Sequence, residues 1–175
     1  MMKFNSEQSG RSMVEMLGVL AIIGVLSVAG IAGYSKAMAK FKQSKLMDQV
    51  SMTAANIRTA YSGQPSYNGL TTSVAQNLGL LDEMKVAAGS YKNSYGGGVT
   101  AAATSGDDTS FELTFTQIPL NACVAIGSAD WGYGSGGLVS LTIGSTGLTA
   151  TGSLADVGTA CAAGGDTNTM KWTYR

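Results

Sequence analysis

The chain has 175 residues, of which 13% are charged and 24 are glycine, and its formal net charge at pH 7 is zero. This length predicts a single folding unit, and a neutral chain has no overall positive field to attract nucleic acid, so no nucleic-acid partner is expected. The absence of histidine excludes Ser-His-Asp and Cys-His catalysis, and two cysteines are too few for a four-thiolate zinc site within one chain. We therefore expect no enzyme activity, no cofactor and no metal.

The N-terminal part contains a long run without any charged residue. Residues 16–35 read MLGVLAIIGVLSVAGIAGYS, and as an α-helix they would span about 30 Å, the thickness of a bilayer core. The run is apolar on all sides, which favours a membrane segment over an amphipathic core helix. A short polar stretch precedes it and no small-residue cleavage site follows it, so we expect this segment to be retained in the mature protein.

The start of this run carries a family resemblance. Gly10 stands five residues before Glu15, and the sequence GRSMVEMLGVLAIIG at 10–24 resembles the leader and N-terminal helix of type IV prepilins. The resemblance implies a prepilin leader at residues 1–10, cleavage between Gly10 and Arg11 by a prepilin peptidase, and N-methylation of the new terminus. Arg11 departs from the Phe or Met that is usual at that position in the family.

Glu15 lies at the edge of the apolar run, where an ionised carboxylate near hydrocarbon costs at least about 2.5 kcal/mol on insertion scales. Such a residue usually has a partner or a function. The resemblance implies that, in a filament of stacked helices, Glu15 faces the amino terminus of a neighbouring subunit. The alternative is that Glu15 lies at the headgroup level of a simple membrane anchor.

Beyond the run, apolar residues recur at three- and four-residue spacing as far as Tyr61, and the sequence Ser-Gly-Gln-Pro at 62–65 ends the pattern. One helix over residues 11–62 is expected, with its apolar half protruding and its second half packed on a globular region. A positive-inside count of the lysines at 36, 40, 42 and 45 would place that region in the cytoplasm. The family resemblance instead implies a cytoplasmic N-terminus, a periplasmic globular region, and an extracellular location after assembly.

Residues 63–175 are expected to form this globular region, built on a small antiparallel β-sheet in an α+β pilin fold. A short helix is predicted over 73–81 with Thr71 or Thr72 as its N-cap, and a loop over 90–108. Alternating apolar residues predict strands at 111–118, 124–126, 139–143 and 170–174. A second short helix is predicted from Ser153 to about Gly164.

The implied export gives the two cysteines a role, because Cys123 and Cys161 could then pair and bound the region 123–161. The alternative is two unrelated buried thiols in a cytosolic protein. Segments around these cysteines, at 118–124, 130–131, 160–161 and 168–172, are similar to type IVb major pilins of the PilS type.

The charges are distributed unevenly, although they sum to zero. Residues 36–58 carry a basic excess of four and residues from 61 onward an acidic excess of four, which suits head-to-tail stacking of copies. Calcium-binding pseudopilins prompt the question of a metal site. Because the acidic residues lack calcium-loop spacing, we interpret them as solvated loop residues, namely Asp107, Asp108, Asp130, Asp156 and Asp166.

Together these features predict the structural subunit of a type IVb-like pilus, used for adhesion, aggregation or mating contact. Its expected partners are copies of itself, the prepilin peptidase, the membrane, and an inner-membrane assembly platform with its ATPase. One alternative is a minor pilin or a type II secretion pseudopilin. The other is a single-span membrane-anchored periplasmic binding protein or enzyme.

Overall fold

The computed structural model describes residues 13–134, 137–149 and 153–175. The chain divides into two compact units, residues 1–40 and 41–175. We call residues 13–40 the stem and residues 41–175 the head. The expected leader, with Gly10 and Arg11, lies outside the described residues.

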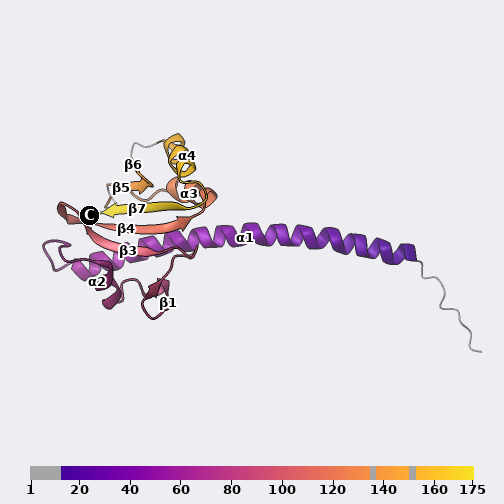
Figure 1. The fold of residues 1–175 in the computed structure, drawn as a ribbon, viewed down its shortest axis with the longest axis horizontal. Helices are drawn as coiled ribbons and strands as arrows, with labels where there is room; N and C mark the ends of the chain where they lie inside the picture. The colour runs from indigo at the N-terminus through magenta and orange to yellow at the C-terminus, as the bar shows by residue number, and fades with distance from the viewer. Residues whose placement is uncertain (1–12, 135–136, 150–152) are drawn as a thin grey trace, which may run out of the picture. The chain divides into compact units, whose positions relative to one another are not determined.

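The first element is the helix α1, Met13–Tyr61, which runs without interruption for 49 residues (Figure 1). In the head part of α1, the side chains of Leu46, Val50 and Ile57 are fully buried. Their spacing of four and seven residues places them on one face of the helix. The amphipathic pattern read from the sequence therefore corresponds to the face that enters the head's core.

The centre of the head is a five-stranded sheet with the order β3-β4-β7-β5-β6. Every neighbouring pair is antiparallel. The strands are β3 (Val99–Thr104), β4 (Asp107–Ile118), β5 (Leu138–Ile143), β6 (Thr146–Leu148) and β7 (Asn168–Tyr174). A separate two-stranded ribbon pairs β1 (Lys85–Ala87) with β2 (Ser90–Tyr91) and follows a 3-10 turn at Asp82–Met84.

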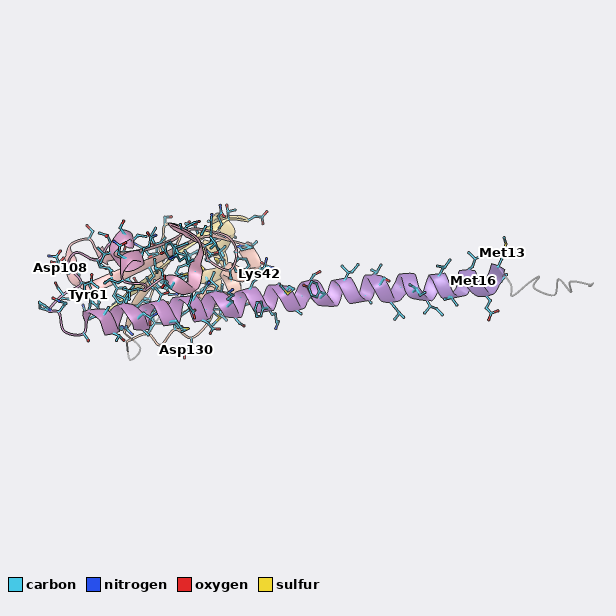
Figure 2. All side chains as sticks on the ribbon, turned by 90° about the horizontal axis from the view of Figure 1, so that it is seen from below. Met13, Met16, Lys42, Tyr61, Asp108 and Asp130 are labelled. Atoms are coloured by element: carbon cyan, nitrogen blue, oxygen red, sulfur yellow. A yellow bond between two sulfur atoms is a disulfide. The ribbon has the colours of Figure 1, made fainter. Side chains whose placement is uncertain are left out.

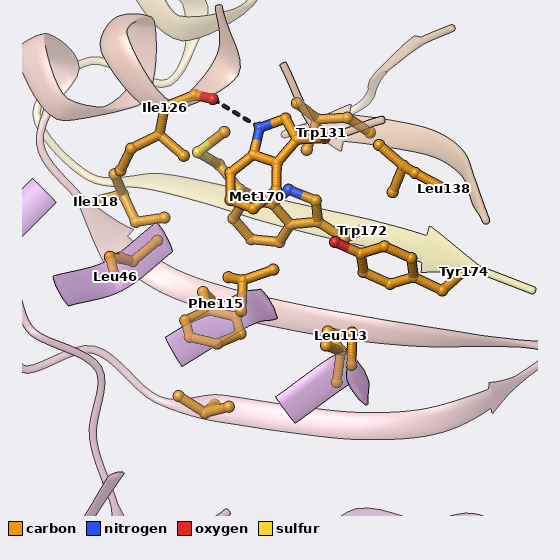
Figure 3. Close-up of a cluster of buried hydrophobic side chains, with 14 of the residues drawn as sticks. Leu46, Leu113, Phe115, Ile118, Ile126, Trp131, Leu138, Met170, Trp172 and Tyr174 are labelled. Carbon is orange, nitrogen blue, oxygen red and sulfur yellow. Dashed lines mark hydrogen bonds between the residues drawn. The ribbon is translucent and has the colours of Figure 1, made fainter. Parts of the chain in front are cut away.

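The core lies on one face of this sheet. Phe111, Leu113 and Phe115 of β4 alternate with more exposed residues, and Leu113 lies opposite Trp172 of β7. Figure 3 shows Leu46 of α1 in the same cluster as these aromatic rings. Trp172 makes edge-on contacts with the rings of both Phe115 and Trp131. The sheet, the second half of α1 and the Trp131 loop thus share one core.

Among the described residues of the head, three short α-helices complete the fold: α2 (Thr72–Asn77), α3 (Leu120–Gly127) and α4 (Leu154–Ala163). The helix expected over 73–81 is shorter than predicted and is capped by Thr71. The capping box expected at Ser153 is present, with Asp156 as its second member.

Two of the expected elements are wrong. The strand predicted at 124–126 is part of α3, because Pro119 occupies the N-cap and Ala122, Cys123 and Ile126 form one buried helical face. The loop predicted over 90–108 contains β2 and β3. In β5, an irregular register between Leu138 and Ser140 leaves Val139 exposed rather than facing the core.

The outer edge of β3 is covered by the segment that leads into α2. The Thr72 hydroxyl accepts a hydrogen bond from the Ala101 amide at 3.1 Å, and the Leu70 carbonyl accepts one from the Ala103 amide at 3.0 Å. These contacts occupy backbone groups that an edge strand would otherwise present to another chain. Residues 70–72 therefore act as a cover for this edge of the sheet.

Candidate assembly surface

The stem is a helix with apolar side chains on all its sides. Large apolar residues along it are exposed, including Leu26 at 65% and Ile31 at 68%, and Figure 2 shows Met13 and Met16 pointing outward. The helix is long and apolar enough to cross a membrane, judged by length and composition. A surface of this extent requires lipid or other apolar helices around it.

Two serines of the stem satisfy their hydroxyl groups within the helix itself. The hydroxyls of Ser27 and Ser35 donate hydrogen bonds to the carbonyls of Ile23 and Ile31, four residues earlier, at 2.7 and 2.8 Å. Such bonds satisfy hydroxyl groups that would otherwise be costly in hydrocarbon. The two serines are therefore compatible with an apolar environment.

Glu15 lies in the first turn of α1 as the structure describes it. A carboxylate at this end of a helix is favoured by the positive end of the helix dipole. The side chain of Glu15 is exposed. It is thus available to a group outside its own chain. Gly10 and Arg11, the predicted cleavage site, fall outside the described residues.

In the head, a disulfide joins α3 to α4. The sulfurs of Cys123 and Cys161 are bonded, and the two cysteines are separated by 38 positions in sequence. Both are fully buried. A Cβ on Gly127 would come within 2.8 Å of the Val157 side chain, which shows how closely the two helices approach. The indole nitrogen of Trp131 donates to the Ile126 carbonyl at 2.8 Å, near the end of α3 (Figure 3).

Arg58, counted in the sequence only as a charge, connects the end of α1 to the end of β7. Its guanidinium lies 5.0 Å from the centre of the Tyr174 ring, and its Nε donates to the Arg175 carbonyl at 3.1 Å. Burial raises the pKa of Tyr174 to about 12, although the charge of Arg58 acts in the opposite direction. A Cβ on Gly137 would overlap the guanidinium. No sequence signal pointed to this contact.

The acidic side chains of the head make local hydrogen bonds. Hydrogen bonds from the side chains of Thr109 and Ser110 lower the pKa of Asp107, and bonds from the backbone and side chain of Ser153 lower that of Asp156. Among the described residues, no group of three or more acidic or cysteine side chains is arranged to hold a metal ion. These carboxylates stabilise a turn and a helix start.

Lys42 and Lys45 lie on the exposed side of α1 in the head, and neither forms an ion pair with any other described residue. The ion pair that the described residues do form joins Lys171 Nζ to Glu112 Oε1 at 3.0 Å. The two lysines are therefore free to meet carboxylates of another molecule.

The sequence and the fold of this chain are similar to those of known proteins. A family model described as PilS N terminal matches residues 40–175. Among solved structures, the crystal structure of TcpA, a type IV pilin from Vibrio cholerae El Tor biotype, is similar with a TM-score of 0.52 and 13% sequence identity, covering 77% of this chain and 99% of that one. At this identity the likeness shows the fold alone. No curated protein matches the sequence.

Proposed function

The chain belongs to the PilS family of type IV pilins, and we propose that it is a type IVb-like major pilin that polymerises into an extracellular fibre. Family and fold make it a structural subunit of a pilus and not an enzyme. The further steps proposed are processing between Gly10 and Arg11, storage in the inner membrane with the head in the periplasm, and assembly by a platform protein and its ATPase.

The exposed apolar surface of the stem is the main support for this proposal. The stem exposes apolar side chains on every side, so its ordinary partners are lipid before assembly and other stems afterwards. A helix needed only as an anchor has no requirement for an acidic residue beside the apolar run, whereas Glu15 gives a stack of such helices a fixed register when it pairs with a positive group. We propose the amino terminus of Arg11 in a neighbouring copy as that group.

Charges in the head support the same stacking. Lys42 and Lys45 are exposed, and so is Asp108. Opposite charges across an interface favour correct encounter and register more than they raise affinity. We propose that these lysines meet acidic residues of another copy. Adhesion, aggregation and mating contact are the uses open to the resulting fibre.

The experiment compares Glu15→Gln with Asp48→Asn in cells that express the full chain. Asp48 is an exposed carboxylate on the same helix within the head, so its variant controls for loss of charge. If Glu15 pairs between copies, Glu15→Gln lowers the yield of sheared surface fibres by about tenfold or more, the factor that corresponds to about 1.4 kcal/mol, and Asp48→Asn leaves the yield near that of the unaltered chain.

Mass spectrometry of the mature N-terminus tests processing in the same samples. An N-methylated Arg11 is expected, and an intact Met1 would show that the chain is a simple anchor. Equal fibre yields from the two variants would contradict the role of Glu15. A correctly processed chain that is scarce in sheared fibres would indicate a minor pilin instead.

A further inference from the structure

The loop between α1 and α2 contains an exposed Asn-Gly pair in a tight turn. The Leu70 amide donates to the Tyr67 carbonyl at 3.0 Å, which places Asn68 and Gly69 at the centre of a β-turn. Gly69 has a φ of +83°, the left-handed region that glycine adopts without strain. Both residues are exposed, and a Cβ built on Gly69 would meet no atom within 4 Å. The space around this peptide bond is therefore open to solvent.

We propose that Asn68 is a site of spontaneous deamidation. The backbone nitrogen of Gly69, once deprotonated by hydroxide, attacks the side-chain Cγ of Asn68; a C–N bond forms, the bond to the amide nitrogen breaks, and ammonia leaves. Solvent water then opens the cyclic imide at either carbonyl and yields aspartate or isoaspartate. No described residue accepts a hydrogen bond from the Gly69 N–H, and the Asn68 side chain makes none with the described residues, so no hydrogen bond of either group has to break before the attack.

Two buried asparagines of the head, Asn93 and Asn168, serve as internal controls for the deamidation rate of Asn68. Asn93 is followed by a small serine, but it is 5% exposed and its side-chain oxygen accepts from the amides of Tyr95 and Gly97. Its side-chain nitrogen donates to the Thr116 carbonyl at 2.8 Å. Asn168 is also buried and donates to the Gly165 carbonyl. Reaction at either residue requires breaking these bonds.

The two products have different structural consequences. Aspartate at position 68 adds a negative charge next to Tyr67, whose amide donates to the Asp108 carbonyl at 2.7 Å. Isoaspartate also inserts one extra carbon into the backbone between residues 68 and 69. That insertion displaces residues 70–72, the cover on the edge of β3, and exposes the amides of Ala101 and Ala103. Deamidation would thus uncover the edge of β3 in an increasing fraction of molecules as the protein ages.

The test incubates the full chain in detergent micelles in mildly alkaline buffer and follows each asparagine by peptide mass spectrometry. The peptide with Asn68 should gain about 1 Da, at a rate at least about tenfold that of Asn93 and Asn168, which is the ratio for a barrier difference of about 1.4 kcal/mol. No gain at Asn68, under conditions where the denatured chain shows it, would overturn the proposal. So would equal gains at all three positions.

Hydrogen exchange separates the two consequences. In aged protein, the amides of Ala101 and Ala103 should exchange at least about tenfold faster, which corresponds to about 1.4 kcal/mol of lost protection. The variant Asn68→Asp, measured when freshly prepared, adds the charge with a normal backbone and should keep the exchange of the unaltered chain. Asn68→Ser should neither gain mass at this position nor change its exchange at Ala101 and Ala103 on ageing. Unchanged exchange in protein with isoaspartate at position 68 would overturn the role of residues 70–72 as the cover.

Discussion

The stem and the head place their apolar side chains in opposite environments. Ile23 of the stem is 53% exposed, whereas Ile57 of the head is fully buried, and both belong to the helix α1. In the stem, apolar residues occur on all sides of the helix; in the head they form one stripe that faces the sheet. The second half of α1 is therefore stabilised within the subunit, while the first half depends on surroundings outside it.

Removal of the disulfide should destabilise the head strongly and leave the stem unaffected. Replacing Cys123 and Cys161 by serine should lower the free energy of unfolding of the head by about 4 kcal/mol in the chain-entropy account, and should leave the helicity of the stem unchanged. Denaturant unfolding of the full chain in detergent, followed by tryptophan fluorescence, measures the head selectively because Trp131 and Trp172 both lie in its core. A midpoint equal to that of the unaltered chain would contradict the prediction.

A matched pair of substitutions tests the two halves of α1 directly. Ile57→Ala should destabilise the head by about 3 kcal/mol, since it leaves a cavity in a packed core. Ile23→Ala should change the same free energy by less than about 0.5 kcal/mol. Both are measured by tryptophan fluorescence in denaturant. Similar losses for the two variants would mean that the stem also contributes to the head's stability.

The contact between α1 and β7 predicts a smaller effect. Arg58→Met keeps the aliphatic part of the side chain but loses the contact with the Tyr174 ring and the hydrogen bond to the Arg175 carbonyl. The free energy of unfolding of the head, measured by tryptophan fluorescence in denaturant, should therefore fall by about 1–2 kcal/mol. Lys45→Met, at an exposed lysine of the same helix, serves as the control and should be nearly neutral. A neutral Arg58→Met would show that the guanidinium contributes no net stability.

The smallest expected effect is a dependence on pH confined to the head. Asp107 and Asp156 have pKa values lowered by hydrogen bonds from their neighbours, so folding favours their ionised forms. Their contribution is complete above the ordinary aspartate pKa of about 4 and is lost as the pH falls through the lowered values. Urea midpoints measured over this acidic range should decrease with pH, and Asp156→Asn should make the decrease shallower. A variant as steep as the unaltered chain would contradict this account.

The parts of the fold that could be predicted are those in which one local pattern dominates. The continuous apolar run, the stripe around Leu46 and Val50, and the cap at Ser153 each have a single structural interpretation. The segment at 124–126 has two possible interpretations. Val124 and Ile126 alternate as in a strand, but a helix places Ile126 on one buried face with Ala122 and Cys123. Pro119 is a helix-start signal, and it favours the helix over the strand for this segment.

The strand β3 was missed for a different reason. Its core-facing residues are Val99, Ala101 and Ala103, and alanine in a run of glycine and threonine has little hydrophobic contrast. The contacts of Arg58 could not be read from the sequence because they join residues 117 positions apart. The role of Glu15 is predicted from its spacing from Gly10, a signal that needs no tertiary information, and it stays a prediction.

The position of β7 in the sheet sets the order in which the head can fold. β7 lies between β4 and β5, yet it is the last of the described strands in chain order. The hairpins β3–β4 and β5–β6 can each form early, but they have no common neighbour until residues 168–174 arrive, and such distant pairing is slow. During synthesis, the edges of β4 and β5 that β7 will join keep unpaired backbone groups until this final strand is delivered.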